Sequence, residues 1–78
     1  MYYVYAIRSL SRNYIYVGMT NDIQRCINEH NNEKNRSTKA YRPFVLIFSK
    51  EFKTRSEARK EEVYLKSGSG KEFLKSIS

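Results

Sequence analysis

The chain has 78 residues, the length of one small domain with little room for a large cofactor cavity. With 29% charged and 40% hydrophobic residues, its composition excludes a disordered tail, a collagen-like fibre and a low-complexity linker. The single cysteine, Cys26, excludes an internal disulfide and a cysteine-rich zinc site. No apolar run approaches the ~20 residues of a membrane span, and the first residues do not resemble a signal peptide. We therefore expect a cytosolic protein with no membrane partner.

Positive charge is concentrated in one third of the sequence. The net charge is +7, and residues 34–60 hold nine basic and two acidic residues, whereas the other 51 residues hold six of each sign. A concentrated basic face suits a polyphosphate partner, because neutralising phosphates releases counterions. The segment therefore favours a nucleic-acid partner, and the alternative is that the charge serves solubility alone.

The first half of the chain predicts a hairpin followed by a helix. Residues 2–7 and 14–19 are rich in Tyr, Val and Ile, which are strong strand formers, and the polar turn between them is of hairpin length. Asn21 is expected to cap a helix, and apolar side chains at helical spacing extend this helix to about His30. A polar loop over residues 31–42 follows.

The second half predicts one strand and two helices. The apolar run at residues 44–48 predicts a third strand buried on both faces. Thr54 and Glu57 form a capping box that opens a helix, and residues 67–70 break this helix before a short final one. The order β-β-α-β-α-α predicts a single α+β domain over residues 1–78, with helices packed on a small three-stranded antiparallel sheet.

Two polar side chains fall on the apolar faces of the predicted helices. On a helical projection His30 lies beside Ile23, towards the protein body, whereas Arg25 points away. Glu62 lies next to the apolar stripe that contains Ala58, and an unpaired buried carboxylate is costly. Glu62 would thus bind a cation or pair with a basic side chain of its own helix, and His30 would serve a site or bond to a carbonyl in the core.

Tyrosine is unusually frequent, with seven in 78 residues. Tyr3 and Tyr5 share one face of the first predicted strand, and Tyr14 and Tyr16 share a face of the second. Side chains on facing strands of a hairpin can meet as cross-strand pairs. The alternatives are tyrosines packed in the core and two phenols at one polar site.

Together these features resemble the GIY-YIG endonuclease superfamily, in particular its small stand-alone bacterial members, which are related to the N-terminal domain of a DNA-repair excinuclease. Tyr3-Val4-Tyr5 stands at the GIY position and Tyr16-Val17-Gly18 at the YIG position. Tyr5 and Tyr16 are 11 residues apart, which matches the family spacing. The first predicted helix, its His30 and the tail at residues 66–74 continue the resemblance over nearly the whole chain.

The resemblance implies a metal-dependent endonuclease that hydrolyses phosphodiester bonds in DNA. By position, Tyr5 would be the base or the orienter of the attacking water, and Tyr16 would contact that water or the scissile phosphate. His30 would assist proton transfer or bind phosphate, and Glu62 would hold one divalent cation, Mg²⁺ or Mn²⁺. We expect the nucleic acid, with RNA as the alternative to DNA, to be contacted by Arg25, Lys39, Arg42 and Arg55.

One position departs from the family pattern. The family places an Arg eight residues after the YIG glycine and four before the His, and Cys26 stands there. An Arg would stabilise charge on the phosphate, so Cys26 predicts weakened cleavage, and its own side chain is expected to pack as a small apolar residue. The alternative function is a nuclease-deficient nucleic-acid-binding module of the same fold. A protein-interaction domain is a third reading.

Overall fold

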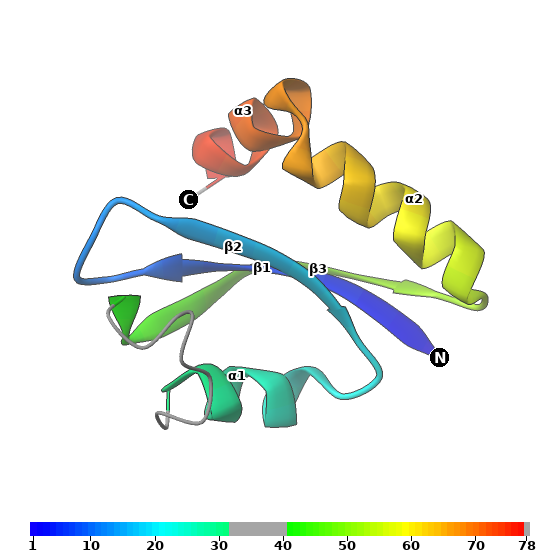
Figure 1. The fold of residues 1–78 in the computed structure, drawn as a ribbon, viewed down its shortest axis with the longest axis horizontal. Coiled ribbons are helices and arrows are strands. Elements are labelled where there is room, and N and C mark those ends of the chain that lie inside the picture. The colour runs from blue at the N-terminus through cyan, green and yellow to red at the C-terminus, as the bar shows by residue number, and fades with distance from the viewer. Residues whose placement is uncertain (32–40, 78) are drawn as a thin grey trace.

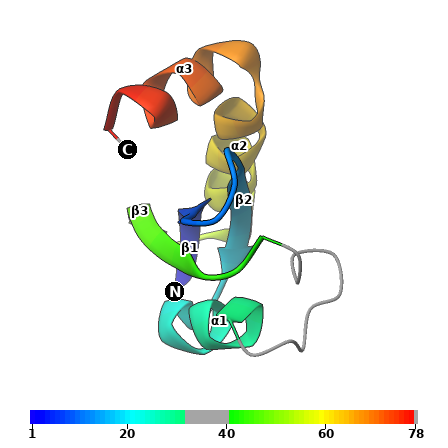
Figure 2. The ribbon, with the colours of Figure 1, turned by 90° about the vertical axis from the view of Figure 1, so that its left-hand side faces the viewer.

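The computed structural model describes residues 1–31 and 41–77, and the predicted α+β fold is confirmed. In this part of the chain a three-stranded antiparallel sheet has α1 on one face and α2 and α3 on the other (Figures 1 and 2). None of the described helices is long and apolar enough to cross a membrane. The elements are β1 (Tyr2–Ser9), β2 (Ile15–Thr20), α1 (Ile23–Asn31), β3 (Phe44–Phe52), α2 (Arg55–Lys66) and α3 (Gly68–Ile77).

Strand β1 forms the centre of the molecule because the strand order is β2-β1-β3. Its side chains alternate between two cores, as the pleat of a strand requires. Val4 and Ala6 pack on the α2 and α3 side, whereas Tyr5 and Ile7 pack on the α1 side. All four are at most 2% exposed, so the middle of β1 is a rigid base for side chains on both faces.

The predicted hairpin is confirmed, and its register sets the positions of the tyrosines. Tyr5 lies opposite Gly18, and Ile7 lies opposite Tyr16. Tyr5 and Tyr16 are therefore diagonal neighbours on the α1 face of the sheet. Their ring centroids are 6.2 Å apart, so the hairpin brings together the two tyrosines that the sequence singled out.

The expectation that residues 44–48 are buried on both faces is wrong. β3 is longer than expected and lies at an edge of the sheet. Phe44 is buried, but Val45 is 36% exposed and Leu46 is 42% exposed. A sheet of three strands has only one central strand, and β1 takes that place, so β3 has a strand neighbour on one side only. A continuous apolar run does not by itself distinguish an edge strand from a central one.

The helix caps agree with the sequence in one case and differ in the other. Thr54 caps α2 as expected, since its Oγ1 accepts a hydrogen bond of 3.2 Å from the backbone N–H of Glu57. In α1 the cap is Asp22 rather than Asn21, because the Arg25 N–H donates to Asp22 Oδ1 at 3.1 Å. β2 extends to Thr20, which moves the start of the helix one residue later.

Asn31 joins the end of α1 to the start of β3. The backbone N–H of Phe44 donates to Asn31 Oδ1 at 2.8 Å, and Asn31 Nδ2 donates to the Phe44 carbonyl at 3.4 Å. The sequence assigned Asn31 to a loop, but it is the last residue of the helix. This paired amide contact fixes the C-terminal turn of α1, which carries His30, against the sheet.

The expected break between α2 and α3 is confirmed, but only Ser67 separates the two helices, because α3 begins at Gly68 rather than after residue 70. The Gly70 N–H donates to Ser67 Oγ at 3.3 Å, and the Lys71 N–H donates to the Ser67 carbonyl at 2.9 Å. A Cβ on Gly70 would lie 2.1 Å from the Tyr64 carbonyl oxygen. The absence of a side chain at Gly70 therefore allows α3 to pack closely on the end of α2.

We predict that Gly70→Ala destabilises the fold by about 1–3 kcal/mol, the usual effect of overpacking, because its Cβ would meet backbone atoms of α2. The matched control is Gly68→Ala in the same helix, where a Cβ meets nothing within 4 Å. Urea unfolding of both variants measures the difference. Equal unfolding midpoints for the two variants would contradict the close packing.

Candidate active site

The hydroxyl of Tyr5 lies at the centre of a polar cluster on the α1 face of the sheet. Its oxygen is 3.2 Å from His30 Nε2, and it accepts a hydrogen bond of 2.9 Å from the Cys26 thiol. The phenol keeps its own hydrogen when it accepts from the thiol, and it donates this hydrogen to His30 Nε2 in the tautomer in which that nitrogen is unprotonated. The three side chains thus form a chain of hydrogen bonds running from α1 to β1 and back to α1.

Tyr16 completes this cluster from β2. Its ring centroid lies 4.7 Å from that of His30, and its side chain is only partly buried. Gly18 leaves the space that Tyr5 occupies, since a Cβ at Gly18 would lie 2.6 Å from the Tyr5 hydroxyl oxygen. The glycine of the Tyr16-Val17-Gly18 motif is therefore needed for the placement of the neighbouring phenol.

Burial controls the protonation of the cluster. Desolvation is the largest cause that raises the pKa of Tyr5 and of Tyr16 above the ordinary value of a tyrosine, and the negative charge of Glu62 raises both further. Burial lowers the pKa of His30, although the charge of Glu29 opposes this shift. At neutral pH both phenols are protonated and His30 is neutral, so the imidazole is the group in the cluster that is ready to accept a proton.

Glu62 projects from α2 and is 8% exposed. Its Oε1 is 3.1 Å from Arg59 Nη1, and its Oε2 is 3.7 Å from Lys66 Nζ. Glu62 is buried, as its place next to the apolar stripe predicts, and the structure shows it paired with basic side chains of its own helix, which was the alternative to cation binding. The neighbouring carboxylate of Glu61 is less buried and pairs with Lys50 at 3.7 Å. Of these two carboxylates, Glu62 is therefore the one that lies at the apolar face of α2.

Glu62 reaches the phenols through its electric field rather than through a hydrogen bond. It lies on α2, whereas Tyr5 and His30 pack on the α1 side of the sheet (Figure 1). Its charge nonetheless raises the pKa of Tyr5 and of Tyr16. A cation at Glu62 would reverse this effect and favour ionisation of both phenols.

The donor set near Glu62 suits a hard cation that keeps part of its water shell. Within the described ranges no group of three or more His, Cys, Asp or Glu side chains could hold a metal. Mg²⁺ is commonly bound through one or two carboxylates, with waters and substrate phosphates completing the shell. Arg59 and Lys66 are largely exposed, so both can leave the carboxylate without unfolding α2. Glu62 therefore offers one carboxylate to a cation, and a Mg²⁺ ion there stays a prediction.

Three of the four residues expected to contact nucleic acid lie in the described part of the chain. Arg25 is exposed, points away as expected and interacts with Glu29 on its own helix. Arg42 is partly buried and donates to the Asn31 carbonyl at 3.5 Å. Arg55 is exposed at the start of α2, and Lys39 lies outside the described residues. These expectations stay predictions.

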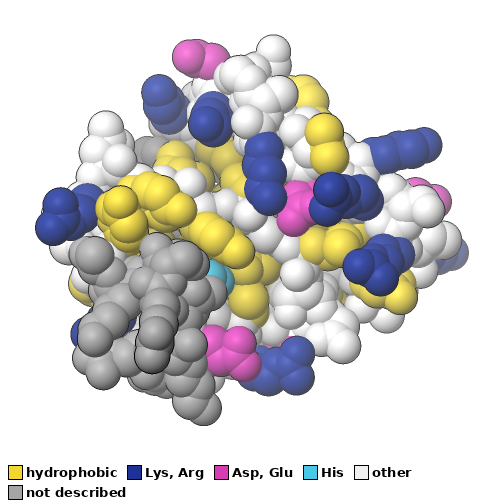
Figure 3. All heavy atoms as spheres, viewed as in Figure 1, with side chains coloured by type: hydrophobic (Ala, Val, Ile, Leu, Met, Phe, Trp, Pro, Cys, Tyr) yellow, Lys and Arg dark blue, Asp and Glu magenta, His cyan; other side chains and the backbone are white. Residues whose placement is uncertain are grey.

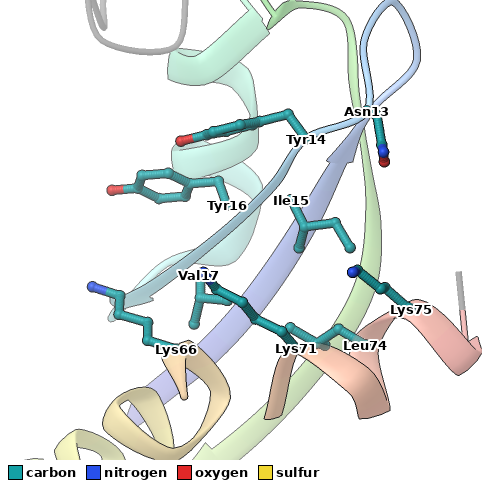
Figure 4. A pocket seen from close by; sticks show the side chains of 9 residues that line it. All are labelled: Asn13, Tyr14, Ile15, Tyr16, Val17, Lys66, Lys71, Leu74 and Lys75. Atoms are coloured by element: carbon teal, nitrogen blue, oxygen red, sulfur yellow. The ribbon is translucent and has the colours of Figure 1, made fainter. Parts of the chain in front are cut away.

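A cleft beside β2 was not anticipated from the sequence. It has a volume of about 640 Å³ and shares Tyr16 with the phenol cluster (Figure 4). The charge excess of the sequence lies at residues 34–60, outside this cleft, but Lys71 and Lys75 are four residues apart and indicate a basic helix face. Its lining residues are Asn13, Tyr14, Ile15, Tyr16, Val17, Lys66, Lys71, Leu74 and Lys75.

The lowered pKa of His30 predicts that the folded protein becomes less stable as the pH falls. Below about 6.5, the ordinary pKa of histidine, the unfolded chain binds a proton that the folded chain does not, so the free energy of unfolding decreases. His30→Gln removes this titration and keeps a hydrogen-bonding group. We expect urea unfolding midpoints at pH 7.5 and 5.5 to differ less in the variant than in the native protein. An unchanged difference would contradict the neutral, buried imidazole.

Comparisons with known proteins agree with this geometry. The profile of the GIY-YIG catalytic domain matches residues 1–75. The UPF0213 protein SSP2268 of Staphylococcus saprophyticus is 36% identical over 78 residues, covering 99% of this chain and 94% of the relative. A UPF0213 protein of Vibrio campbellii is 41% identical over 64 residues, covering 81% of this chain and 61% of the relative.

A solved structure extends the comparison to the fold. The solution NMR structure of the UPF0213 protein BH0048 from Bacillus halodurans superposes with a TM-score of 0.58 at 32% sequence identity, and the match covers 100% of this chain and 86% of that one. The motif positions, the fold and the extent of the match all lead to one assignment: the chain belongs to the GIY-YIG nuclease family and is related to the UPF0213 proteins.

Proposed function

We propose that the protein is a divalent-metal-dependent endonuclease that hydrolyses phosphodiester bonds in DNA, with Tyr5, Tyr16, His30 and Glu62 as its catalytic residues. The observation that carries this proposal is the hydrogen-bonding distance of 3.2 Å between the Tyr5 hydroxyl and a neutral His30. A protonated phenol held against an unprotonated imidazole is a ready pathway for removing a proton from an attacking water. Family membership supports the same chemistry.

The two phenols and the imidazole take different roles in this proposal. With its raised pKa, Tyr5 is a poor base at neutral pH, but it orients the water and passes a proton on to His30 Nε2. His30 accepts that proton because it is neutral beforehand. Tyr16 lies 4.7 Å from the His30 ring and is partly exposed, so it is placed to meet the scissile phosphate from the solvent side.

Glu62 would hold the divalent cation through a carboxylate oxygen. The ion supplies Lewis-acid polarisation of the phosphate and offsets its developing charge. Without it, Arg59 and Lys66 neutralise Glu62, so binding of the ion requires these two side chains to move away. The side chains of Arg59 and Lys66, once they leave Glu62, would be available to attract a phosphate.

Cys26 supports the alternative function, a nucleic-acid-binding module with little or no cleavage. The thiol stands at the position of the family's Arg and donates a hydrogen bond to Tyr5, so a neutral group occupies the place of a permanent charge. A neutral thiol gives the phosphate far less stabilisation than a guanidinium does. The same contact agrees with weakened rather than absent cleavage, because it keeps Tyr5 in position beside His30.

We predict that Glu62→Gln abolishes cleavage in Mg²⁺ while DNA binding in EDTA is retained, because the amide is a weak ligand for a hard cation. The matched control is Glu61→Gln on the adjacent surface position of α2, which should cleave like the native protein. Cleavage of nicked and branched DNA by both variants is the measurement. Retained cleavage by Glu62→Gln would remove Glu62 as the metal ligand.

We predict that Cys26→Arg raises the cleavage rate by about 10²–10³-fold, the usual worth of a positioned group that stabilises developing charge. A guanidinium beside Tyr5 would also favour the phenolate. Cys26→Ser keeps a small hydrogen-bond donor and should cleave at the native rate. Equal rates for the Arg and Ser variants would show that the position does not face the phosphate.

A further inference from the structure

The cleft along β2 combines an apolar floor with a basic rim. Tyr16 of β2 and the preceding Tyr14 extend to the side of α1, whereas Ile15 and Val17 of β2 extend towards α3 (Figure 4). Together with Leu74, the two aliphatic side chains form the floor, and the basic rim comes from the helices on the other side. The rim consists of Lys66 at the end of α2 and of Lys71 and Lys75 on α3.

The lysines are arranged as a row rather than as a single point of charge. Lys71 and Lys75 are four residues apart on α3, so their Cβ atoms lie about 5–6 Å apart, close to the separation of successive phosphates along a strand. Lys66 extends the row towards the phenol cluster. Lys and Arg side chains gather over α3 and the adjoining end of α2 on this face (Figure 3).

The cleft follows the chain over several residues. Its lining runs from Asn13 to Val17, and the last three of these residues belong to β2, where each residue adds ~3.3 Å. Its volume of about 640 Å³ lies within the range of ~300–1,000 Å³ that ligand pockets occupy. The cleft therefore fits a short run of a chain-like anion better than one small anion.

The cleft is continuous with the candidate active site at two residues. Tyr16 lines the cleft and lies 4.7 Å, centroid to centroid, from the His30 ring. Lys66 lines the cleft and lies 3.7 Å from the Glu62 carboxylate. A strand that follows the row of lysines is therefore delivered to Tyr16 and Glu62, the two groups that the proposed function places at the scissile phosphate.

We propose that this cleft binds the phosphodiester backbone of the nucleic-acid strand that enters the active site, with Lys66, Lys71 and Lys75 contacting consecutive phosphates on one side of the scissile bond. The inference rests on the nucleic-acid-binding part of the proposed function. It places the principal phosphate contacts outside the basic segment 34–60. Single strands and duplexes offer the same phosphodiester chemistry, and the experiment separates them.

The test measures binding in EDTA, so that it does not depend on cleavage. Fluorescence anisotropy with a labelled single strand and with the matching duplex gives the dependence of affinity on salt. The double variant Lys71→Ala/Lys75→Ala should reduce the slope of log affinity against log salt by about 1.4 on the single strand or about 1.8 on the duplex, ~0.7 or ~0.9 per lost contact. The matched control is Lys53→Ala/Lys60→Ala, which removes two exposed lysines that do not line the cleft and should change the slope less.

Backbone amide shifts in NMR locate the contact independently. On titration with either nucleic acid, the largest shifts should fall on residues 13–17 and 71–75. Equal salt slopes in the two double variants, or shifts centred elsewhere, would overturn the cleft assignment. If an acidic strand-forming peptide shifts residues 13–17 and neither nucleic acid does, the occupant is a protein segment and the proposal is wrong.

The outcomes separate this inference from the proposed function. Lysine-dependent binding without cleavage in Mg²⁺ would support the cleft and contradict the endonuclease. Cleavage together with lysine-independent binding would support the endonuclease and contradict the cleft. No binding to either probe would contradict both.

Discussion

The contact between Tyr5 and Gly18 is the constraint on which the site depends. The hairpin register sets these residues opposite each other, and the missing side chain of Gly18 admits the phenol. In this position the Tyr5 hydroxyl oxygen lies 3.2 Å from His30 Nε2 and accepts a hydrogen bond from the Cys26 thiol. Any larger residue at position 18 would displace the phenol from both partners.

Burial gives the candidate site its chemical character. Removing the phenols from water keeps them protonated, and the nearby charge of Glu62 adds to this effect. The free protein is thus held in a resting state in which Glu62 is neutralised by Arg59 and Lys66. In the proposed mechanism, a cation at Glu62 and a phosphate beside Tyr16 would together convert this state into an active one.

Much of the fold could be predicted because local patterns and tertiary packing agree. The strand propensity of residues 2–7, the Thr54 cap and the apolar stripe around Ala58 each predicts a local structure that the fold adopts. β3 differs because an apolar run records only hydrophobicity, whereas its place at the sheet edge is set by the pairing of β1 with two partners.

In the candidate site, the burial of His30 and Glu62 could be predicted because it follows from helix geometry. Contacts that join distant segments could not be predicted. The paired amide contact of Asn31 with Phe44 and the meeting of β2 with Lys71 in one cleft depend on how the elements pack. The distribution of charge along the sequence gives the number of lysines in each segment, but it does not show which lysines lie on the same surface of the folded protein.

The measurement that tests the account most directly is metal-dependent cleavage by the native protein and by Tyr5→Phe on a panel of nicked, flapped, branched and single-stranded DNA and RNA. The account predicts cleavage of DNA by the native protein in Mg²⁺ or Mn²⁺, none in EDTA, and a large loss of rate in Tyr5→Phe with binding retained. Cleavage that persists undiminished in Tyr5→Phe would contradict the role of the Tyr5–His30 pair.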